Sequence, residues 1–261
     1  MPSTSAVHQS LTALPVYNEV EHVREVLEQV SRYSSRILVV DDGSTDGTAD
    51  VLREMLDVQV VRHKENRGYG AALVSAFGYA QDHGYQTLVT IDCDGQHEPQ
   101  LIPRFVEAIN RGDADIISGS RYLQLPPADA TAPEDRRRIN RIITAELNDL
   151  LDLRLTDAFC GFKAYRVSSL AELDLVEPGY AMPLELWIKA LAAGQRVLEL
   201  PVPLVYLEEK RSFGGALDDA DSRLCYYRTV IRKALQEVSP HLDEASAFDR
   251  SCHTLCGDSY E

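Results

Sequence analysis

The sequence lacks any long apolar run, and this absence argues against a membrane-spanning helix. No stretch of its 261 residues approaches the roughly 18 consecutive apolar residues that a membrane-spanning helix needs. Residues 1–10 are polar and contain no apolar segment of the kind found in signal peptides. We therefore expect a cytoplasmic chain that makes at most peripheral contact with the inner face of a membrane.

Basic residues are also in short supply. The chain has 26 Lys and Arg against 41 Asp and Glu, which gives a net charge of −15. A surface this acidic repels nucleic acid and anionic lipid, so we expect neither as a bulk partner. Local basic clusters could still bind phosphate.

Cysteines are few and form no paired framework. The count of five is odd, which favours reduced thiols. Cys252, His253 and Cys256 have the spacing of half a metal site, but no second pair lies near them. We interpret this segment as a loose tail.

The first half of the chain alternates short apolar runs with longer segments of helical period, the pattern of a parallel sheet with crossover helices. Strands are predicted at residues 11–15, 36–40, 58–61, 86–91 and 114–118. Helices are predicted at 20–32, from Asp46, at 68–82, and from Pro99 to Asn110. The fold class is therefore α/β, with a Rossmann-like and mostly parallel sheet flanked by helices.

The second half is less regular. Residues 123–135 are rich in Pro, Ala and Asp and indicate a loop. We expect helices at 139–151, 183–193 and 222–237, a short strand at 161–165, and extended chain at 197–207. No repeat or linker interrupts the pattern, so we expect one domain at 11–238, a disordered N-terminus at 1–10 and a flexible tail at 239–261.

Acidic residues follow two of the predicted strands, where ligands bind in open parallel sheets. Asp41 and Asp42 follow the second strand, and Asp92 and Asp94 follow the fourth, with Gln96 close behind. Two carboxylates one residue apart can face one cation, and hard oxygen ligands suit Mg²⁺ or Mn²⁺. Asp92 and Asp94 could instead only cap the following helix.

Asp42 has two interpretations. An ionised carboxylate only accepts hydrogen bonds, so it suits uracil or guanine, each of which presents a ring N–H. An Asp in the segment DDGS is also an ordinary turn former. The segment NRGYG at 66–70 is predicted to begin a helix, with a phosphate contact as the less favoured alternative.

These segments together resemble a known family. The matching motifs are LPVYNE at 14–19, VDDGSTDGT at 40–48, IDCDGQHEP at 91–99, GSRY at 119–122 and TDAFCGFK at 156–163. The chain resembles the family 2 glycosyltransferases of GT-A fold, most of all the dolichyl- and polyprenyl-phosphate sugar synthases that transfer mannose or glucose. The resemblance covers about residues 11–215.

The resemblance implies a role for each matching residue. Asp92, Asp94 and Gln96 would hold the metal. Arg121, with one or more of Arg136, Arg137, Arg138 and Arg141, would receive an acceptor phosphate, and Asp157 would shape that site. Arg211 would contact the donor diphosphate. The base and ribose would be held by Pro15, Tyr17, Glu19 and Asp42, with Asp92 facing the ribose.

The implied reaction is an inverting, metal-dependent transfer of a hexose from a GDP- or UDP-sugar. A phosphate acceptor is already anionic and needs no general base. A hydroxyl acceptor needs one, and Asp157 or Glu185 are the candidates. Glu185 could equally be a first-turn acid of its helix, and the arginine run at 136–138 could be a solvated face.

Departures from the family pattern keep three hypotheses open. The chain lacks the membrane helices of many relatives, the segment 210–217 lacks their Ser-Lys pair, and residues 123–135 carry no apolar helix. The first hypothesis, which we prefer, is transfer to a polyprenyl phosphate, and the second is transfer to a soluble or protein-linked hydroxyl. The third hypothesis is a non-catalytic nucleotide-binding relative, which the full Asp92, Asp94 and Gln96 set disfavours.

Overall fold

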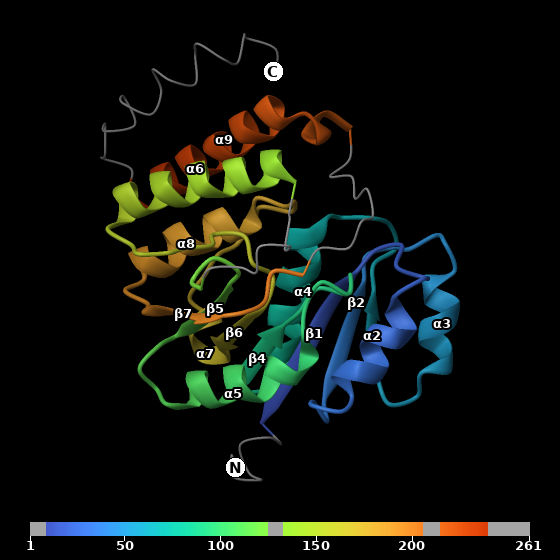
Figure 1. The fold of residues 1–261 in the computed structure, drawn as a ribbon. Helices are drawn as coiled ribbons and strands as arrows, with labels where there is room; N and C mark the ends of the chain where they lie inside the picture. The colour runs from blue at the N-terminus through green and yellow to red at the C-terminus, as the bar shows by residue number, and fades with distance from the viewer. Residues whose placement is uncertain (1–8, 125–132, 206–214, 240–261) are drawn as a thin grey trace.

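A single seven-stranded sheet organises the chain. The structure is a computed structural model that describes residues 9–124, 133–205 and 215–239 (Figure 1). Strand order is β3-β2-β1-β4-β6-β5-β7. The strand bounds are β1 Ser10–Val16, β2 Ile37–Asp41, β3 Gln59–Arg62, β4 Thr87–Thr90, β5 Ile116–Ser120, β6 Lys163–Arg166 and β7 Val197–Pro201. Only β6 runs antiparallel to its neighbours β4 and β5 among these strands, so the mostly parallel α/β sheet is confirmed.

Helices cover both faces of this sheet. One face packs against α2 Val23–Val30, α3 Thr48–Glu54 and α5 Ile102–Asn110, which follows the short 3₁₀ turn η1 Pro99–Leu101. The other face packs against α4 Tyr69–Asp82, α7 Val167–Leu170 and α8 Met182–Ala192. Beyond α8 lie α6 Glu134–Leu151 and α9 Ala220–Val238, preceded by η2 Gly215–Asp218; α6 and α9 run side by side in Figure 1.

The apolar runs of the central strands follow from this double covering. In β2, Leu38 and Val40 join the core under α4, whereas Ile37 and Val39 join the core under α2 and α5. Successive side chains of a strand point to opposite faces, so a strand covered on both faces must be apolar at every position. The run RILVV is therefore a strand signal rather than a helix signal.

Several expected boundaries need correction. The loop expected at 123–135 ends earlier, because α6 already begins at Glu134. Glu134 and Asp135 lie in its first turn, where carboxylates stabilise the positive end of the helix dipole, and Asp135 also pairs with Arg223 at 2.8 Å. The helix expected at 20–32 is shorter, and α7 and η2 were not expected. Residues 125–132 of the loop and 206–207 of the extended segment lie outside the described ranges.

The strand order places the loops of interest together. Strands β2 and β3 lie on one side of β1, and β4 lies on the other. The loops that leave β1, β2 and β4 at their carboxyl ends therefore meet at the point where the strand order reverses, the usual ligand site of such sheets. The expected tails at 1–10 and 239–261 fall almost wholly outside the described ranges.

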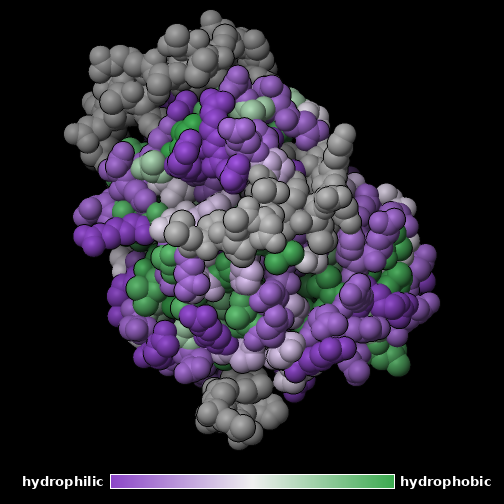
Figure 2. All heavy atoms as spheres, viewed as in Figure 1, coloured by the Kyte–Doolittle hydropathy of each residue, from purple (hydrophilic) through white to green (hydrophobic). Residues whose placement is uncertain are grey.

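On the face drawn in Figure 2, apolar residues form separate groups among hydrophilic ones. Across the described ranges, no helix combines the length and the apolar character that crossing a bilayer requires.

Candidate active site

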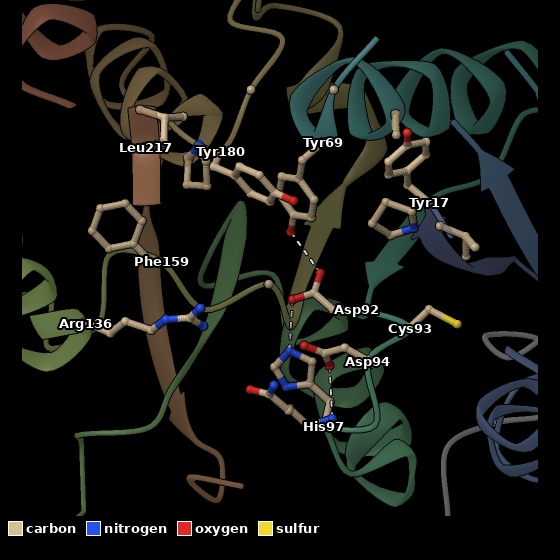
Figure 3. A pocket seen from close by; sticks show the side chains of 18 of the residues that line it. Tyr17, Tyr69, Asp92, Cys93, Asp94, His97, Arg136, Phe159, Tyr180 and Leu217 are labelled. Carbon is tan, nitrogen blue, oxygen red and sulfur yellow. Dashed lines mark hydrogen bonds and ion pairs between the residues drawn. The ribbon is translucent and has the colours of Figure 1, made fainter. Parts of the chain in front are cut away.

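A cavity of about 880 Å³ lies at the carboxyl ends of β1, β2 and β4. It brings together residues from the loops after these strands, from the start of α4 and from α6 and α9 (Figure 3). Eight of the residues expected to form the site line it: Pro15, Tyr17, Glu19, Asp42, Asp92, Asp94, Gln96 and Arg121.

Two loops fastened to each other form one wall. Asn18 has a left-handed backbone, with a φ of 55°, which Asn tolerates better than most residues. Its amide donates to Ser44 Oγ at 2.9 Å, and its side-chain oxygen accepts from the amide of Thr45 at 2.8 Å. The amide of Glu19 donates to Thr48 Oγ1 at 2.9 Å. These bonds hold the loop after β1 against the loop after β2.

Asp42 lies deep in this wall and is only 2% exposed. Its carboxylate accepts from the amides of Arg67 at 2.9 Å and Gly68 at 2.7 Å, and it contacts His63 Nδ1 at 2.6 Å. The amide of Ala71 donates to the carbonyl of Pro178. The amides of Gly68 and Ala71 at the start of α4 are therefore bonded to acceptors within the protein, and α4 begins at Tyr69, one residue later than predicted.

Asp92 is held from two sides at the floor of the cavity. Tyr69 donates its hydroxyl to Oδ1 at 2.9 Å, and His97 Nε2 lies 3.2 Å from Oδ2 (Figure 3). Burial raises the pKa of Asp92, but the contacts with His97 and Tyr69 lower it, and the net pKa lies below the usual value. Gly161 packs so closely that an added Cβ would lie 2.1 Å from Oδ2. Asp92 is thus a fixed carboxylate.

The oxygen atoms of Asp92, Asp94 and Gln96 suit a cation that binds the protein and the substrate at the same time. Asp94 lines the same cavity as Asp92, and its Oδ1 accepts from the amide of Gln96 at 3.0 Å. Within the described ranges, no group of three or more His, Cys, Asp or Glu side chains converges as a complete metal cage. Two carboxylates and an amide fit Mg²⁺ or Mn²⁺, which commonly complete their shell with water and phosphate oxygens.

Arg121 faces the cavity and is anchored by a buried carboxylate. Its Nε donates to Asp157 Oδ2 at 2.6 Å and its Nη2 to Oδ1 at 2.9 Å, and Asn140 also donates to Oδ1, at 2.7 Å. Burial raises the pKa of Asp157, but the guanidinium beside it more than offsets this, so the net pKa is lowered. The paired geometry fixes the plane of Arg121 and leaves its other N–H groups for a ligand.

The far end of the cavity is basic and apolar. Arg136 from α6 and Arg223 from α9 line it, together with Phe159, Leu217 and Tyr227. Arg223 is 3% exposed and donates to the carbonyl of Leu217 at 2.8 Å.

The sequence matches one known protein family across the loops of the site. The profile of the family described as glycosyl transferase family 2 matches residues 12–174, which include the loops after β1, β2 and β4. The chain belongs to glycosyl transferase family 2. It is therefore a glycosyltransferase.

Two curated relatives of this glycosyltransferase are similar over most of their length. The undecaprenyl-phosphate mannosyltransferase of Micrococcus luteus is 32% identical over 222 residues, or 80% of this chain and 90% of the relative. The polyprenol monophosphomannose synthase of Mycolicibacterium smegmatis is 32% identical over 206 residues, or 74% of this chain and 76% of the relative.

A solved structure shares the fold of the glycosyltransferase. Glucosyl-3-phosphoglycerate synthase of Mycobacterium tuberculosis, in complex with Mn²⁺, UDP and phosphoglyceric acid, superposes with a TM-score of 0.67 at 18% identity. The alignment covers 90% of this chain and 80% of that one. At this identity the likeness supports the GT-A, single-domain fold and nothing further.

Three of the expected site residues that the structure describes do not line the cavity. Glu185 is 2% exposed, pairs with Lys189 at 2.8 Å and accepts from the amides of Val176 and Glu177, so it does not line the cavity. Asp157 lies behind Arg121 and is fully buried. Arg138 is exposed on α6, where its neighbour Arg136 faces the cavity instead. Arg211 lies outside the described residues.

The glycosyltransferase site also contains residues that the sequence did not single out. Tyr69 and His97 hold Asp92. Tyr69 lies in the segment predicted to begin a helix, and His97 lies in the motif at 91–99. Arg223 lies on the last helix and is 88 residues from its partner Asp135. No local sequence pattern predicts that two residues so far apart in the chain are partners.

Proposed function

We propose that this glycosyltransferase transfers a hexose from a GDP- or UDP-sugar to a polyprenyl phosphate, with inversion at the anomeric carbon and with Mg²⁺ or Mn²⁺. One observation carries the proposal: the Asp92 and Asp94 carboxylates and the Arg121 and Arg136 guanidinium groups line the same cavity. Carboxylates can hold a metal–diphosphate, and arginines can hold an acceptor anion. The names of the two curated relatives agree with such an acceptor.

The donor would lie along the loops after β1, β2 and β4. Asp42 would accept a ring N–H of the base, which favours uracil or guanine over adenine or cytosine. Asp92 and Asp94 would hold the metal, with Gln96 as a further ligand. The ion would supply neutralisation of the charge that develops on the leaving diphosphate.

The acceptor phosphate would bind at Arg121 and Arg136. Asp157 would hold Arg121 in place rather than act as a base, because Arg121 and Asn140 engage its carboxylate and its side chain is fully buried. A phosphate monoester oxygen would form the bond to the anomeric carbon while the bond from that carbon to the diphosphate oxygen breaks. The nucleoside diphosphate leaves, and no proton has to be removed from the acceptor.

The test is transfer from GDP-mannose or UDP-glucose to farnesyl phosphate in the presence of Mn²⁺. We expect a phosphodiester product with the opposite anomeric configuration to the donor, measured by mass spectrometry and NMR. Asp94→Ala should lower turnover by at least about a hundredfold, because a ligand of the metal is lost. Asp82→Ala, at the exposed end of α4, is the matched control and should retain native turnover.

Two outcomes would contradict parts of the proposal. Native turnover of Asp94→Ala in EDTA would rule out the metal assignment. Transfer to a sugar alcohol with none to farnesyl phosphate would move the function to a hydroxyl acceptor.

A further inference from the structure

A buried histidine lies behind the wall of the cavity that is formed by the loops after β1 and β2. His63 follows β3, is 8% exposed and does not line the cavity. Its Nδ1 lies 2.6 Å from Asp42 Oδ1, and its Nε2 lies 2.9 Å from Ser75 Oγ on α4. Because an ionised carboxylate only accepts hydrogen bonds, the proton must be on Nδ1 for this contact to be a hydrogen bond.

His63 fixes the direction in which Asp42 can accept. Within the described residues, Oδ1 of Asp42 takes His63 Nδ1 and the Arg67 amide, whereas Oδ2 takes the Gly68 amide. A carboxylate has about four acceptor positions, so these contacts leave one on Oδ2, and Asp42 lines the cavity. Rotation of the carboxylate would turn that position away and would break its bonds to the chain at 67–68.

The backbone around Asp42 leaves little room for adjustment. Gly43 has a φ of +75°, and an added Cβ would lie 2.5 Å from the carbonyl carbon of Glu65. The turn after β2 and the segment before α4 are thus in direct contact. The residue after Gly68 is Tyr69, which donates to Asp92. The segment that Asp42 holds therefore reaches the metal side of the cavity as well.

We propose that His63 is a positioning residue for the nucleotide. Its ring bridges Ser75 Oγ and the Asp42 carboxylate, which it holds against the amides of Arg67 and Gly68. The remaining acceptor position of Asp42 then meets the ring N–H of the base. This inference rests on the proposed function. His63 acts on donor binding and not on the transfer step.

The test separates the hydrogen bond from the packing of the ring. His63→Leu keeps much of the volume but removes the donor, and His63→Asn keeps an N–H near the position of Nδ1 but removes volume. Calorimetric titration of UDP and of GDP with Mn²⁺ should show a Kd about tenfold or more weaker for His63→Leu, because a charge-assisted hydrogen bond is lost. The Kd of His63→Asn should lie within about threefold of the native value, because this variant keeps the N–H donor that His63→Leu loses.

Kinetics provide a second measurement that a purely structural role would not reproduce. The KM for the donor should rise in His63→Leu, whereas kcat should change little. His83→Leu is the matched control, because His83 is exposed at the other end of α4. It should behave as the native protein in both measurements.

Each other outcome decides against the inference. If His63→Leu binds the nucleotide with native affinity, His63 has no role in nucleotide binding. If His63→Asn loses as much affinity as His63→Leu, the ring acts through packing and not through its hydrogen bond. If His63→Leu is unfolded at the assay temperature, Ser75→Ala replaces it, and an unchanged Kd there would overturn the inference. If the native protein binds neither nucleotide, the proposed function fails and the inference falls with it.

Discussion

At the scale of single residues, Asp157 and Arg121 form a charged contact with two hydrogen bonds. Asp157→Asn keeps the shape of the side chain but leaves the Arg121 guanidinium beside a neutral amide. Removing one partner of a buried pair typically costs about 3 kcal/mol or more of the free energy of unfolding. We expect that loss in urea unfolding at pH 7, together with a raised KM for the acceptor. Unchanged stability would show that Asp157 does not hold Arg121.

The pH dependence of this contact has a definite sign. The pKa of Asp157 is lowered in the folded state by Arg121, against the effect of burial. Its contribution to stability is therefore present above the unfolded pKa of about 3.9 and is lost as pH falls through the lower folded pKa.

Gly161 offers a second test at the residue scale. An added Cβ would lie 2.1 Å from Asp92 Oδ2, so Gly161→Ala must displace Asp92 or the backbone. We expect a loss of about 1–3 kcal/mol of stability from this overpacking. Mn²⁺-dependent nucleotide binding should weaken as well, measured by calorimetry. Gly78→Ala is the control: no atom lies within 4 Å of its added Cβ, and it should stabilise α4 by up to about 1 kcal/mol. Equal effects of the two substitutions would contradict the argument.

At the scale of elements, Asp115 joins β5, β6 and β7. It lies just before β5, at the end of these strands opposite to the site. It accepts from Arg166 Nε at the end of β6 at 3.2 Å and from the amide of Arg196 before β7 at 2.9 Å. Burial raises the pKa of Asp115, but these bonds and the two guanidinium charges lower it, and the net pKa is below the usual value.

Asp115→Asn should therefore destabilise the fold by about 2 kcal/mol at pH 7, the usual value of hydrogen bonds to a charged group. The stabilisation by ionised Asp115 is present above the unfolded pKa of about 3.9 and fades as pH falls through the folded pKa. The difference in free energy of unfolding between the variant and the native protein should thus shrink below about pH 4. A difference that stays constant from pH 7 to pH 3 would contradict this assignment.

What sequence alone can predict follows from how far apart partners lie in the chain. The acidic and Asn-Glu segments after β1, β2 and β4 each carry their chemistry within a few residues, and all of them line the cavity. Arg121 and Asp157 are 36 residues apart, so nothing local shows that Asp157 is an anchor rather than an accessible base. The start of α6 at Glu134, five residues before the predicted start at 139, has a related reason. Asp135 is stabilised there by Arg223, 88 residues away.

At the scale of the whole molecule, ligand binding should couple to unfolding. A ligand that binds only the folded state at about 100 times its Kd adds about 2.7 kcal/mol, which for a chain of this size raises Tm by roughly 5–10 °C. We expect that shift for UDP or GDP with Mn²⁺, measured by calorimetric melting. Mn²⁺ alone should shift Tm by less than about 2 °C, because two carboxylates and an amide leave the shell of the ion incomplete without a diphosphate.

Nucleotide binding should depend on the metal, because both the protein, with its net charge of −15, and the diphosphate are anionic. A nucleoside diphosphate without metal meets the Asp92 and Asp94 carboxylates in the same cavity and is repelled by them. With EDTA the nucleotide should therefore give only a small shift, and adding excess Mn²⁺ should restore the full one. In Asp94→Ala the repulsion falls and the metal ligand is lost together, so the shifts with EDTA and with Mn²⁺ should converge. A native shift that is the same with and without metal would mean that the two carboxylates do not meet the diphosphate at all.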